Sequence, residues 1–281
     1  MISVLILTFN EEQNLSSCLE SVQWSDDVLV LDSFSTDRTL EVARAAGVRT
    51  LQNRFVNFAE QRNLGIDQAG FKYDWVLHLD ADERVTPELR EELLQVVARA
   101  KKKAYRLSSK TMFGRVWLKR SGLFPSYQVR LGRRESLRFK MVGHGQRETL
   151  GPAEVGTLQN SLLHFSFAKG LPDWFAKHRR YAAAEAEENL KHRSSGSFSF
   201  ARLFSSDPLI RRRALKEFST RLPCRPALRF FYMYIVRMGF LDGKAGFTYC
   251  RLLSIYEGMI VARTRALREE AKRASLKPTS L

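Results

Sequence analysis

The first hundred residues alternate between short apolar runs and longer segments with apolar residues at helical spacing. The apolar runs predict strands buried on both faces, at Ile2–Leu7, Val28–Leu31, Val48–Leu51 and Trp75–Leu79. The segments between them predict helices at Glu11–Val22, from Ser35 or Thr36 to Gly47, at Phe58–Ala69, and from about Pro87 to Lys101. Four alternations of strand and helix predict an α/β fold, a mostly parallel sheet with helices on both faces.

The pattern changes after residue 101. Short β-like pieces separated by Gly and Pro predict mixed sheet and loops, at Ala104–Leu107, Gln128–Leu131, Leu137–Val142 and Leu158–Phe165. Helical spacing follows, at Trp174–Leu190, Pro208–Phe218, Ala227–Leu241 and Phe247–Leu267. We therefore expect one domain at 1–168, with halves 1–100 and 101–168, and a helical extension at 169–281.

Charge divides the chain in the same way. Residues 1–100 carry 9 Lys/Arg and 17 Asp/Glu, whereas residues 101–281 carry 37 and 13, within a net charge of +16. A basic half beside an acidic half favours an anionic partner, such as nucleic acid, a phosphorylated glycolipid or a membrane surface. A solvated basic surface is the alternative.

Cysteine usage and the apolar stretches limit the cellular context. Cys18, Cys224 and Cys250 show no metal-site or disulfide spacing, which fits a reducing compartment. Met1 leads into an apolar strand without a basic region before it, so we expect no signal peptide. The longest apolar stretch, Phe230–Leu241, is interrupted by an arginine and is too short to span a bilayer.

Polar residues follow three of the predicted strands. Asp80 and Asp82 come at the end of one strand, where alternation would point both carboxylates the same way. Such a pair suits a divalent metal that holds a diphosphate, although D-x-D also occurs by chance in solvated loops. Thr8–Asn10 and Asp32–Ser33 follow two other strands. In parallel sheets, ligands bind beyond these carboxyl ends.

Four motifs in this order resemble the family 2 glycosyltransferases. They are SVLILTFNEE at 3–12, VLDSFSTD at 30–37, AEQRN at 59–63 and LDADE at 79–83. Within that family the chain resembles enzymes that add sugars to bacterial lipopolysaccharide core or related surface glycans. The likeness is strong over 1–150 and looser through Leu162–Phe165 and Gly239–Gly243. It implies a GT-A fold, a nucleotide-diphosphate sugar as donor, and inversion at the anomeric carbon.

The resemblance assigns residues to the donor. Thr8, Asn10 and Glu11 match the loop beside the nucleotide. Asp32 matches a carboxylate that accepts hydrogen bonds from base or ribose; the alternative is that it caps the next helix. Arg62 lies at the donor edge and would neutralise phosphate, unless it is an ordinary surface arginine.

The same resemblance implies a metal, Mg²⁺ or Mn²⁺. Asp82 is the expected ligand, and Asp80 lies alongside to contact ribose or metal. The ion would offset the charge on the leaving nucleoside diphosphate. Glu83 is expected to be an acid at a helix start, where negative charge is favoured. His164 is expected at a packed strand end.

The acceptor side needs a base for the attacking hydroxyl. Related lipopolysaccharide enzymes show an adjacent His-Glu pair here, but His144 and Glu148 are separated by three residues. Glu148 is the candidate base and His144 the alternative. In a purely structural interpretation, Glu148 instead pairs with Arg147 or Arg130.

Basic residues extend the prediction to phosphate and membrane. Arg115 and Arg130 match an acceptor-side loop, where they would hold diphosphate or acceptor phosphate. The helices after Lys169, notably Arg211–Arg213, combine aromatic and basic residues. They predict docking on an anionic membrane with a lipid-linked or lipopolysaccharide acceptor, unless they only pack as a helical cap. The expected location is cytoplasmic, peripheral on the inner membrane.

Three other functions compete with this one. A transferase of the same fold could act on polyprenyl phosphate. A nucleotidyltransferase also combines a nucleotide pocket with carboxylates, but the chain lacks an early Gly-rich loop with Lys or Arg. A nucleic-acid-binding module would explain the basic half, but no motif for one is present. No nucleic-acid partner is therefore expected.

Overall fold

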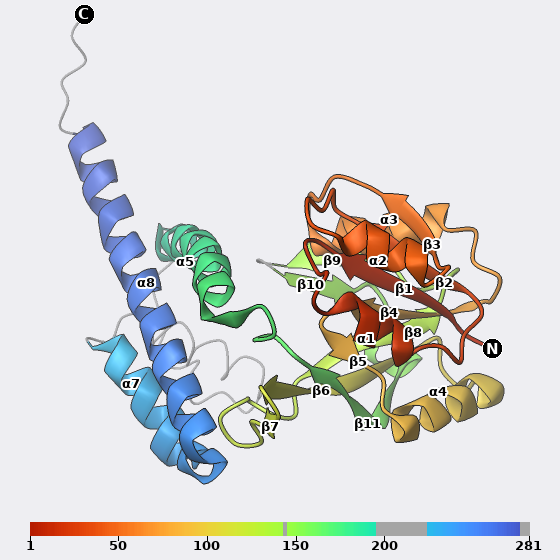
Figure 1. Ribbon diagram of the computed structural model, residues 1–281. Coiled ribbons are helices and arrows are strands. Elements are labelled where there is room, and N and C mark those ends of the chain that lie inside the picture. The colour runs from red at the N-terminus through yellow and green to blue at the C-terminus, as the bar shows by residue number, and fades with distance from the viewer. Residues whose placement is uncertain (143–144, 195–223, 276–281) are drawn as a thin grey trace, which may run out of the picture. The chain divides into compact units, whose positions relative to one another are not determined.

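The computed structural model describes residues 1–142, 145–194 and 224–275 (Figure 1). The chain forms two compact units, Met1–Leu171 and Pro172–Leu281. The sequence places the corresponding boundary between residues 168 and 169.

The first unit is built on one mixed sheet, nine-stranded within the described residues. Its strands are β1 (Ser3–Thr8), β2 (Val28–Asp32), β3 (Arg49–Gln52), β4 (Trp75–Asp80), β5 (Glu83–Arg84), β6 (Ala104–Phe113), β7 (Val116–Trp117), β8 (Tyr127–Arg133) and β11 (Val155–His164). They lie in the order β3-β2-β1-β4-β8-β6-β11-β5, with β7 beside β6. Strands β1 to β4 are parallel, whereas β8 is antiparallel to both of its neighbours. This confirms the predicted α/β class with a mostly parallel sheet.

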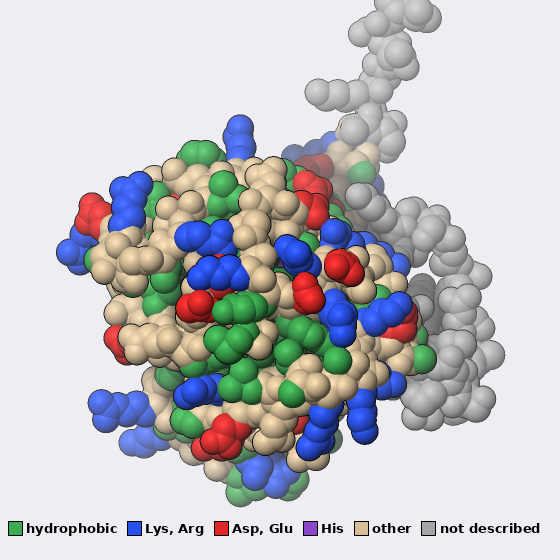
Figure 2. Space-filling model, turned by 90° about the vertical axis from the view of Figure 1, so that its right-hand side faces the viewer, with side chains coloured by type: hydrophobic (Ala, Val, Ile, Leu, Met, Phe, Trp, Pro, Cys, Tyr) green, Lys and Arg blue, Asp and Glu red, His purple; other side chains and the backbone are tan. Residues whose placement is uncertain are grey.

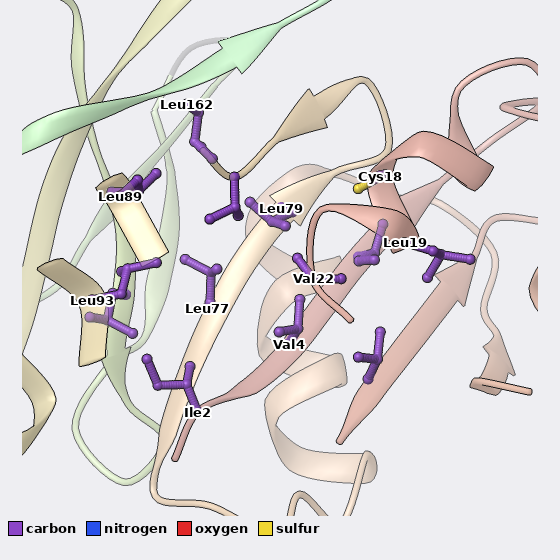
Figure 3. Close-up of a cluster of buried hydrophobic side chains, with 14 of the residues drawn as sticks. Ile2, Val4, Cys18, Leu19, Val22, Leu77, Leu79, Leu89, Leu93 and Leu162 are labelled. Atoms are coloured by element: carbon purple, nitrogen blue, oxygen red, sulfur yellow. The ribbon is translucent and has the colours of Figure 1, made fainter. Parts of the chain in front are cut away.

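Helices cover both faces of this sheet, as predicted. They are α1 (Leu15–Glu20), α2 (Thr39–Ala45), α3 (Phe58–Gln68) and α4 (Pro87–Arg99). Alternation along β1 explains the two layers. Val4 packs in a core with Leu19 of α1 and Leu89 of α4 (Figure 3). Leu5 packs in a second core beside Phe58 of α3.

Two helices begin later than the sequence pattern predicts. Helix α1 begins at Leu15 rather than at Glu11. Asn10 has a left-handed φ of 54° and does not cap the helix; its Oδ1 accepts from the Thr36 backbone N–H at 2.8 Å. Helix α2 begins at Thr39 rather than at Ser35 or Thr36. Both intervening stretches are loops whose polar groups bond to one another.

A small hairpin lies apart from the main sheet. Strands β9 (Phe139–Val142) and β10 (Gly145–Glu148) pair antiparallel. The Asn63 side chain of α3 both donates to and accepts from the Phe139 backbone, each at 2.9 Å. The hairpin is thus fixed to the helix that also carries Arg62.

The second unit is helical, as predicted. The helices are α5 (Gly170–Ser194), which starts in the first unit, α7 (Arg225–Phe231), the π-helix η3 (Tyr232–Val236), the 3₁₀ turn η4 (Gly239–Asp242) and α8 (Gly243–Ser275). Met233, Cys250 and Leu253 form its small core. The predicted helix Pro208–Phe218, with Arg211–Arg213, lies outside the described residues.

Two surface properties follow from the side chains. No helix in the described ranges combines the length and hydropathy that crossing a bilayer requires. On the face in Figure 2, Lys and Arg are interspersed with Asp, Glu and hydrophobic side chains. This face is therefore not a surface of single charge.

Candidate functional site

The polar residues predicted at strand ends meet at one edge of the sheet. Thr8 pairs in register with Asp32, and Leu7 pairs with Asp80. Strand β11 is parallel to β6, and β6 is antiparallel to β8, which is antiparallel to β4. His164, the last residue of β11, therefore lies at the same edge as Asp80.

Asp32 organises the loop that follows β2. Its buried carboxylate accepts from Thr8 Oγ1 at 3.0 Å, from the Ser35 backbone N–H at 2.9 Å and from Gln52 Nε2 at 3.1 Å. The predicted alternative, a cap on the next helix, is wrong. Helix α2 is preceded by Arg38, which makes no side-chain cap.

Glu11, in the loop after β1, has a partner that the sequence did not reveal. Lys169 Nζ lies 2.6 Å from Glu11 Oε1 and donates to the Asn10 carbonyl at 3.2 Å. Asn14 Nδ2 donates to Glu11 Oε2 at 2.7 Å. Burial raises the pKa of Glu11, although both hydrogen bonds favour the ionised carboxylate. Because 158 residues separate Glu11 from Lys169, no local pattern could predict this pair.

Asp80 is held between two buried arginines. Arg62 Nη2 lies 2.6 Å from Asp80 Oδ1, and Arg130 Nη2 lies 2.8 Å from Oδ2. Arg130 Nη2 also lies 2.7 Å from Glu83 Oε1. The Arg62 side chain is only 1% exposed and that of Arg130 4%. The alternative that Arg62 is a surface arginine is therefore wrong.

Glu83 also departs from its prediction. It is a buried residue of β5 rather than an acid at a helix start, because α4 begins only at Pro87. Its Oε2 accepts from the Asp80 backbone N–H at 3.0 Å. Burial raises the pKa of Glu83. Burial alone would also raise the pKa of Asp80, but Arg130 and Arg62 hold it well below its ordinary value, so Asp80 stays ionised.

Asp82 contacts His164, whereas Asp80 contacts the two arginines. Strand β4 ends at Asp80, so alternation does not extend to Asp82. Asp82 Oδ2 lies 3.2 Å from His164 Nε2, and the Asp82 carbonyl accepts from the Phe165 backbone N–H at 2.8 Å. Although burial favours the neutral imidazole, Asp82, Glu83 and Asp80 raise the pKa of His164 to about 9. His164 is at a strand end, as predicted, but its side chain also contacts Asp82 in the candidate site.

The donor atoms of Asp82 and His164 fit a divalent ion. Among the described residues, no group of three or more His, Cys, Asp and Glu side chains could hold a metal. A carboxylate oxygen and an imidazole nitrogen are nevertheless ligands that Mg²⁺ or Mn²⁺ accepts, and phosphate oxygens and water complete such sites. Asp80 fits less well, because both of its oxygens already accept from arginines.

The acceptor-side candidates lie partly within the described residues. Glu148, half-buried on β10, pairs in register with Phe139. His144 lies outside the described residues. Arg130, one of the two partners considered for Glu148, is instead buried against Asp80 and Glu83. Arg115 is exposed in the turn that follows β6.

The family comparison agrees with this geometry. Residues 3–141 match the family Glycosyl transferase family 2. These residues form a family 2 glycosyltransferase domain. The match covers all four motifs, and it confirms the family resemblance seen in the sequence.

The proteins similar to this chain include bacterial glycosyltransferases. An uncharacterised glycosyltransferase of Rickettsia typhi is 33% identical over 34% of this chain and 33% of its own length. The lipopolysaccharide core biosynthesis glycosyltransferase LpsC of Rhizobium meliloti is 24% identical over 68% and 72%. The chain thus spans about a third of the length of the Rickettsia relatives it matches.

The solved structures found to be similar are more distant in sequence. S. aureus TarS 1–349 is 16% identical with a TM-score of 0.43, covering 97% of this chain and 91% of its own. Glucosyl-3-phosphoglycerate synthase of Mycobacterium tuberculosis is 21% identical with a TM-score of 0.45, covering 66% and 79%. Both TM-scores are below 0.5, and neither structure assigns a residue or a ligand to this chain.

Proposed function

We propose that this chain transfers a sugar from a nucleotide-diphosphate sugar to lipopolysaccharide core or another bacterial surface glycan. The observation that carries the proposal is the juxtaposition of Asp32, Asp80 and the Asp82–His164 pair at the carboxyl edge of a family 2 glycosyltransferase domain. The likeness to LpsC supports this acceptor class. Residues 1–168 would form the catalytic domain and 169–281 the basic extension.

In this proposal the loops after β1 and β2 bind the nucleotide. Thr8, Asn10 and Glu11 lie beside it, and Asp32 accepts hydrogen bonds from base or ribose. Asp80 accepts from the ribose. Arg62 serves the donor through Asp80, because its Nη2 holds that carboxylate at 2.6 Å.

Asp82 and His164 would hold Mg²⁺ or Mn²⁺. The bound ion would supply positive charge to the leaving nucleoside diphosphate. The ionised Asp82 carboxylate can ligate the ion directly, whereas the His164 imidazole must be neutral to ligate it. Because the pKa of His164 is raised, binding of the ion would release a proton from its imidazole.

On the acceptor side, Glu148 is proposed to take the proton of the attacking hydroxyl, with His144 as the alternative. The hydroxyl oxygen forms its bond to the anomeric carbon while the bond to the diphosphate oxygen breaks and its electron pair leaves with the diphosphate. Displacement from the opposite side inverts the configuration.

The proposed setting is cytoplasmic and peripheral on the inner membrane, with a lipid-linked or lipopolysaccharide acceptor and no nucleic acid. A polyprenyl phosphate acceptor is the alternative within the same fold. A nucleic-acid-binding module is the alternative from another class, since the chain carries a net charge of +16.

The donor test is a thermal-shift screen of nucleotide-diphosphate sugars with Mn²⁺. A ligand at a hundred times its Kd stabilises the native state by about 2.7 kcal/mol, so a true donor should raise the melting temperature by several degrees. Donors that score are then assayed for hydrolysis and for transfer to lipopolysaccharide core or polyprenyl phosphate. No shift with any donor, together with a salt-sensitive shift of DNA or RNA on gels, would contradict the proposal.

A further inference from the structure

Helices α7 and η3 are apolar on two opposite faces. One face is buried within the second unit, where Met233 packs with Cys250 and Leu253 of α8. Arg225 fixes the start of α7 to Glu257 of α8 at 2.8 Å, and Figure 1 shows the two helices side by side. Helices α7, η3 and α8 therefore share a core of their own, and the second apolar face does not contribute to it.

The second face is exposed. Its side chains recur at helical spacing and continue into the turn at η4: Leu228 (45% exposed), Phe231 (56%), Tyr232 (44%), Ile235 (45%), Val236 (58%), Met238 (39%), Phe240 (44%) and Leu241 (60%). We name this set the exposed stripe. Single exposed apolar residues are ordinary, but a contiguous set marks an interaction surface. A helix that is apolar all round is expected only where both faces are covered.

Charge around the exposed stripe indicates what covers it. Apart from Arg225, which is paired with Glu257, residues 224–251 contain four basic residues, Arg229, Arg237, Lys244 and Arg251, and a single acid, Asp242. A second copy of this surface would bring like charges together, which disfavours self-association. An anionic lipid surface instead complements the basic residues and accepts apolar and aromatic side chains at its interface.

We propose that the exposed stripe is the element with which this protein docks on an anionic membrane. Its apolar side chains would enter the lipid interface while the flanking basic residues contact the headgroups. This rests on the proposed function only in the role given to the membrane, which is to bring the lipid-linked acceptor to the enzyme. Docking through the exposed stripe differs from docking through Arg211–Arg213, because the apolar side chains contribute binding free energy to the membrane that salt does not remove.

The test uses the full chain and flotation with two kinds of vesicle, phosphatidylcholine alone and phosphatidylcholine with phosphatidylglycerol. Wild type should bind the anionic vesicles. The triple variant Phe231→Ser, Ile235→Ser, Leu241→Ser should bind at least tenfold more weakly, because each change removes apolar surface that membrane binding would bury. The matched control is Val56→Ser, Val116→Ser, which changes residues 66% and 45% exposed in the first unit and should bind like wild type.

Three results would overturn the proposal: no binding of wild type to anionic vesicles, undiminished binding of the triple variant, or a wild-type dimer that the triple variant converts to monomer in light scattering.

Should the triple variant prove unfolded, Val236→Cys in a Cys224→Ser background offers a second measurement. Cys18 and Cys250 are buried, so an environment-sensitive maleimide labels position 236. Its emission should shift to the blue with anionic vesicles, and an unchanged emission would also overturn the proposal. Donor binding, measured separately without lipid, tests the proposed function independently.

Discussion

The side-chain amide of Asn63 satisfies both backbone groups of Phe139. Its Nδ2 donates to the Phe139 carbonyl and its Oδ1 accepts from the Phe139 N–H, each at 2.9 Å. Asn63 therefore acts like a neighbouring strand at the edge of β9. It joins the helix that carries Arg62 to the hairpin that carries Glu148.

Asn63→Asp should weaken this connection. The carboxylate cannot donate to the Phe139 carbonyl, so one buried acceptor loses its partner at a cost of about 1–3 kcal/mol. If Glu148 serves the acceptor, the KM for the acceptor should rise or transfer should slow while the Kd of the nucleoside diphosphate stays near normal. Calorimetry and transfer assays measure the two separately. Gln68→Glu, the same change of amide to acid at an exposed site of α3, is the control. Equal effects of the two variants would contradict the connection.

Arg130→Met should destabilise the fold strongly. It removes the arginine partner of the buried Glu83 carboxylate and one of the two arginine partners of Asp80, and leaving a buried carboxylate unpaired in this way costs about 3–5 kcal/mol. Urea unfolding measures the loss. Arg90→Met, at an exposed position of α4, should change stability by less than about 0.5 kcal/mol. A loss equally small for Arg130→Met would show that Asp80 and Glu83 do not depend on it.

Asp32→Asn should weaken nucleotide binding by about 1–3 kcal/mol, the usual cost of losing a charged hydrogen-bond partner. The substitution keeps the shape of the side chain but replaces one acceptor oxygen with a donor. Because Asp32 also accepts from Thr8 and Ser35, the melting temperature should fall too. Calorimetry with the nucleoside diphosphate decides between two roles. Unchanged affinity with a lower melting temperature would mean that Asp32 only organises the loop.

The parts of this structure that the sequence predicts are those set by short-range patterns. Alternation along β1 places Val4 and Leu5 in different cores, which is why period and length sufficed to predict a parallel sheet with helices on both faces. The carboxyl ends of parallel strands lie at one edge of a sheet, so the sequence alone predicts that Thr8, Asp32 and Asp80 lie close together.

The contacts that the sequence did not predict join distant parts of the chain. Asp82 and His164 are 82 residues apart, and the pairing of β5 with β11 brings them together. The local sequence predicts that Glu83 is an acid at a helix start, but the same strand pairing buries Glu83, and its carboxylate contacts Arg130. The late start of α1 has a related cause, because the loop at Asn10 bonds to Ser35 and Thr36 on another loop.

His78 should make stability depend on pH. Burial, with Arg62 and Arg130 nearby, holds the pKa of His78 well below its ordinary value, and among the described residues neither ring nitrogen has a hydrogen-bond partner. As pH falls through about 6.5, the unfolded chain takes up a proton at this residue and the native chain does not. Stability is therefore present above that pH and declines toward acid, by at most about 1.4 kcal/mol per pH unit from this group.

The test of this pH dependence compares wild type with His78→Leu by urea unfolding at pH 7 and pH 5.5 with EDTA present. The variant lacks the titrating group, so its stability should fall less on acidification. Other groups contribute equally to both proteins and cancel in the difference. Parallel falls in the two proteins would contradict the assignment to His78.

Metal binding gives the sharpest test of the Asp82–His164 pair. Asp82→Asn and His164→Ala should each abolish or greatly reduce transfer, and EDTA should do the same to wild type, because the proposed ion offsets the charge on the leaving diphosphate. Calorimetry with Mn²⁺ and the nucleoside diphosphate gives a readout apart from activity, and both variants should lose the metal-dependent part of the binding. Asp74→Asn, at an exposed residue just before β4, is the matched control and should bind normally. If His164→Ala keeps metal-dependent binding while Asp82→Asn loses it, His164 only orients Asp82. If neither variant nor EDTA has any effect, the reaction runs without a metal at this edge of the sheet.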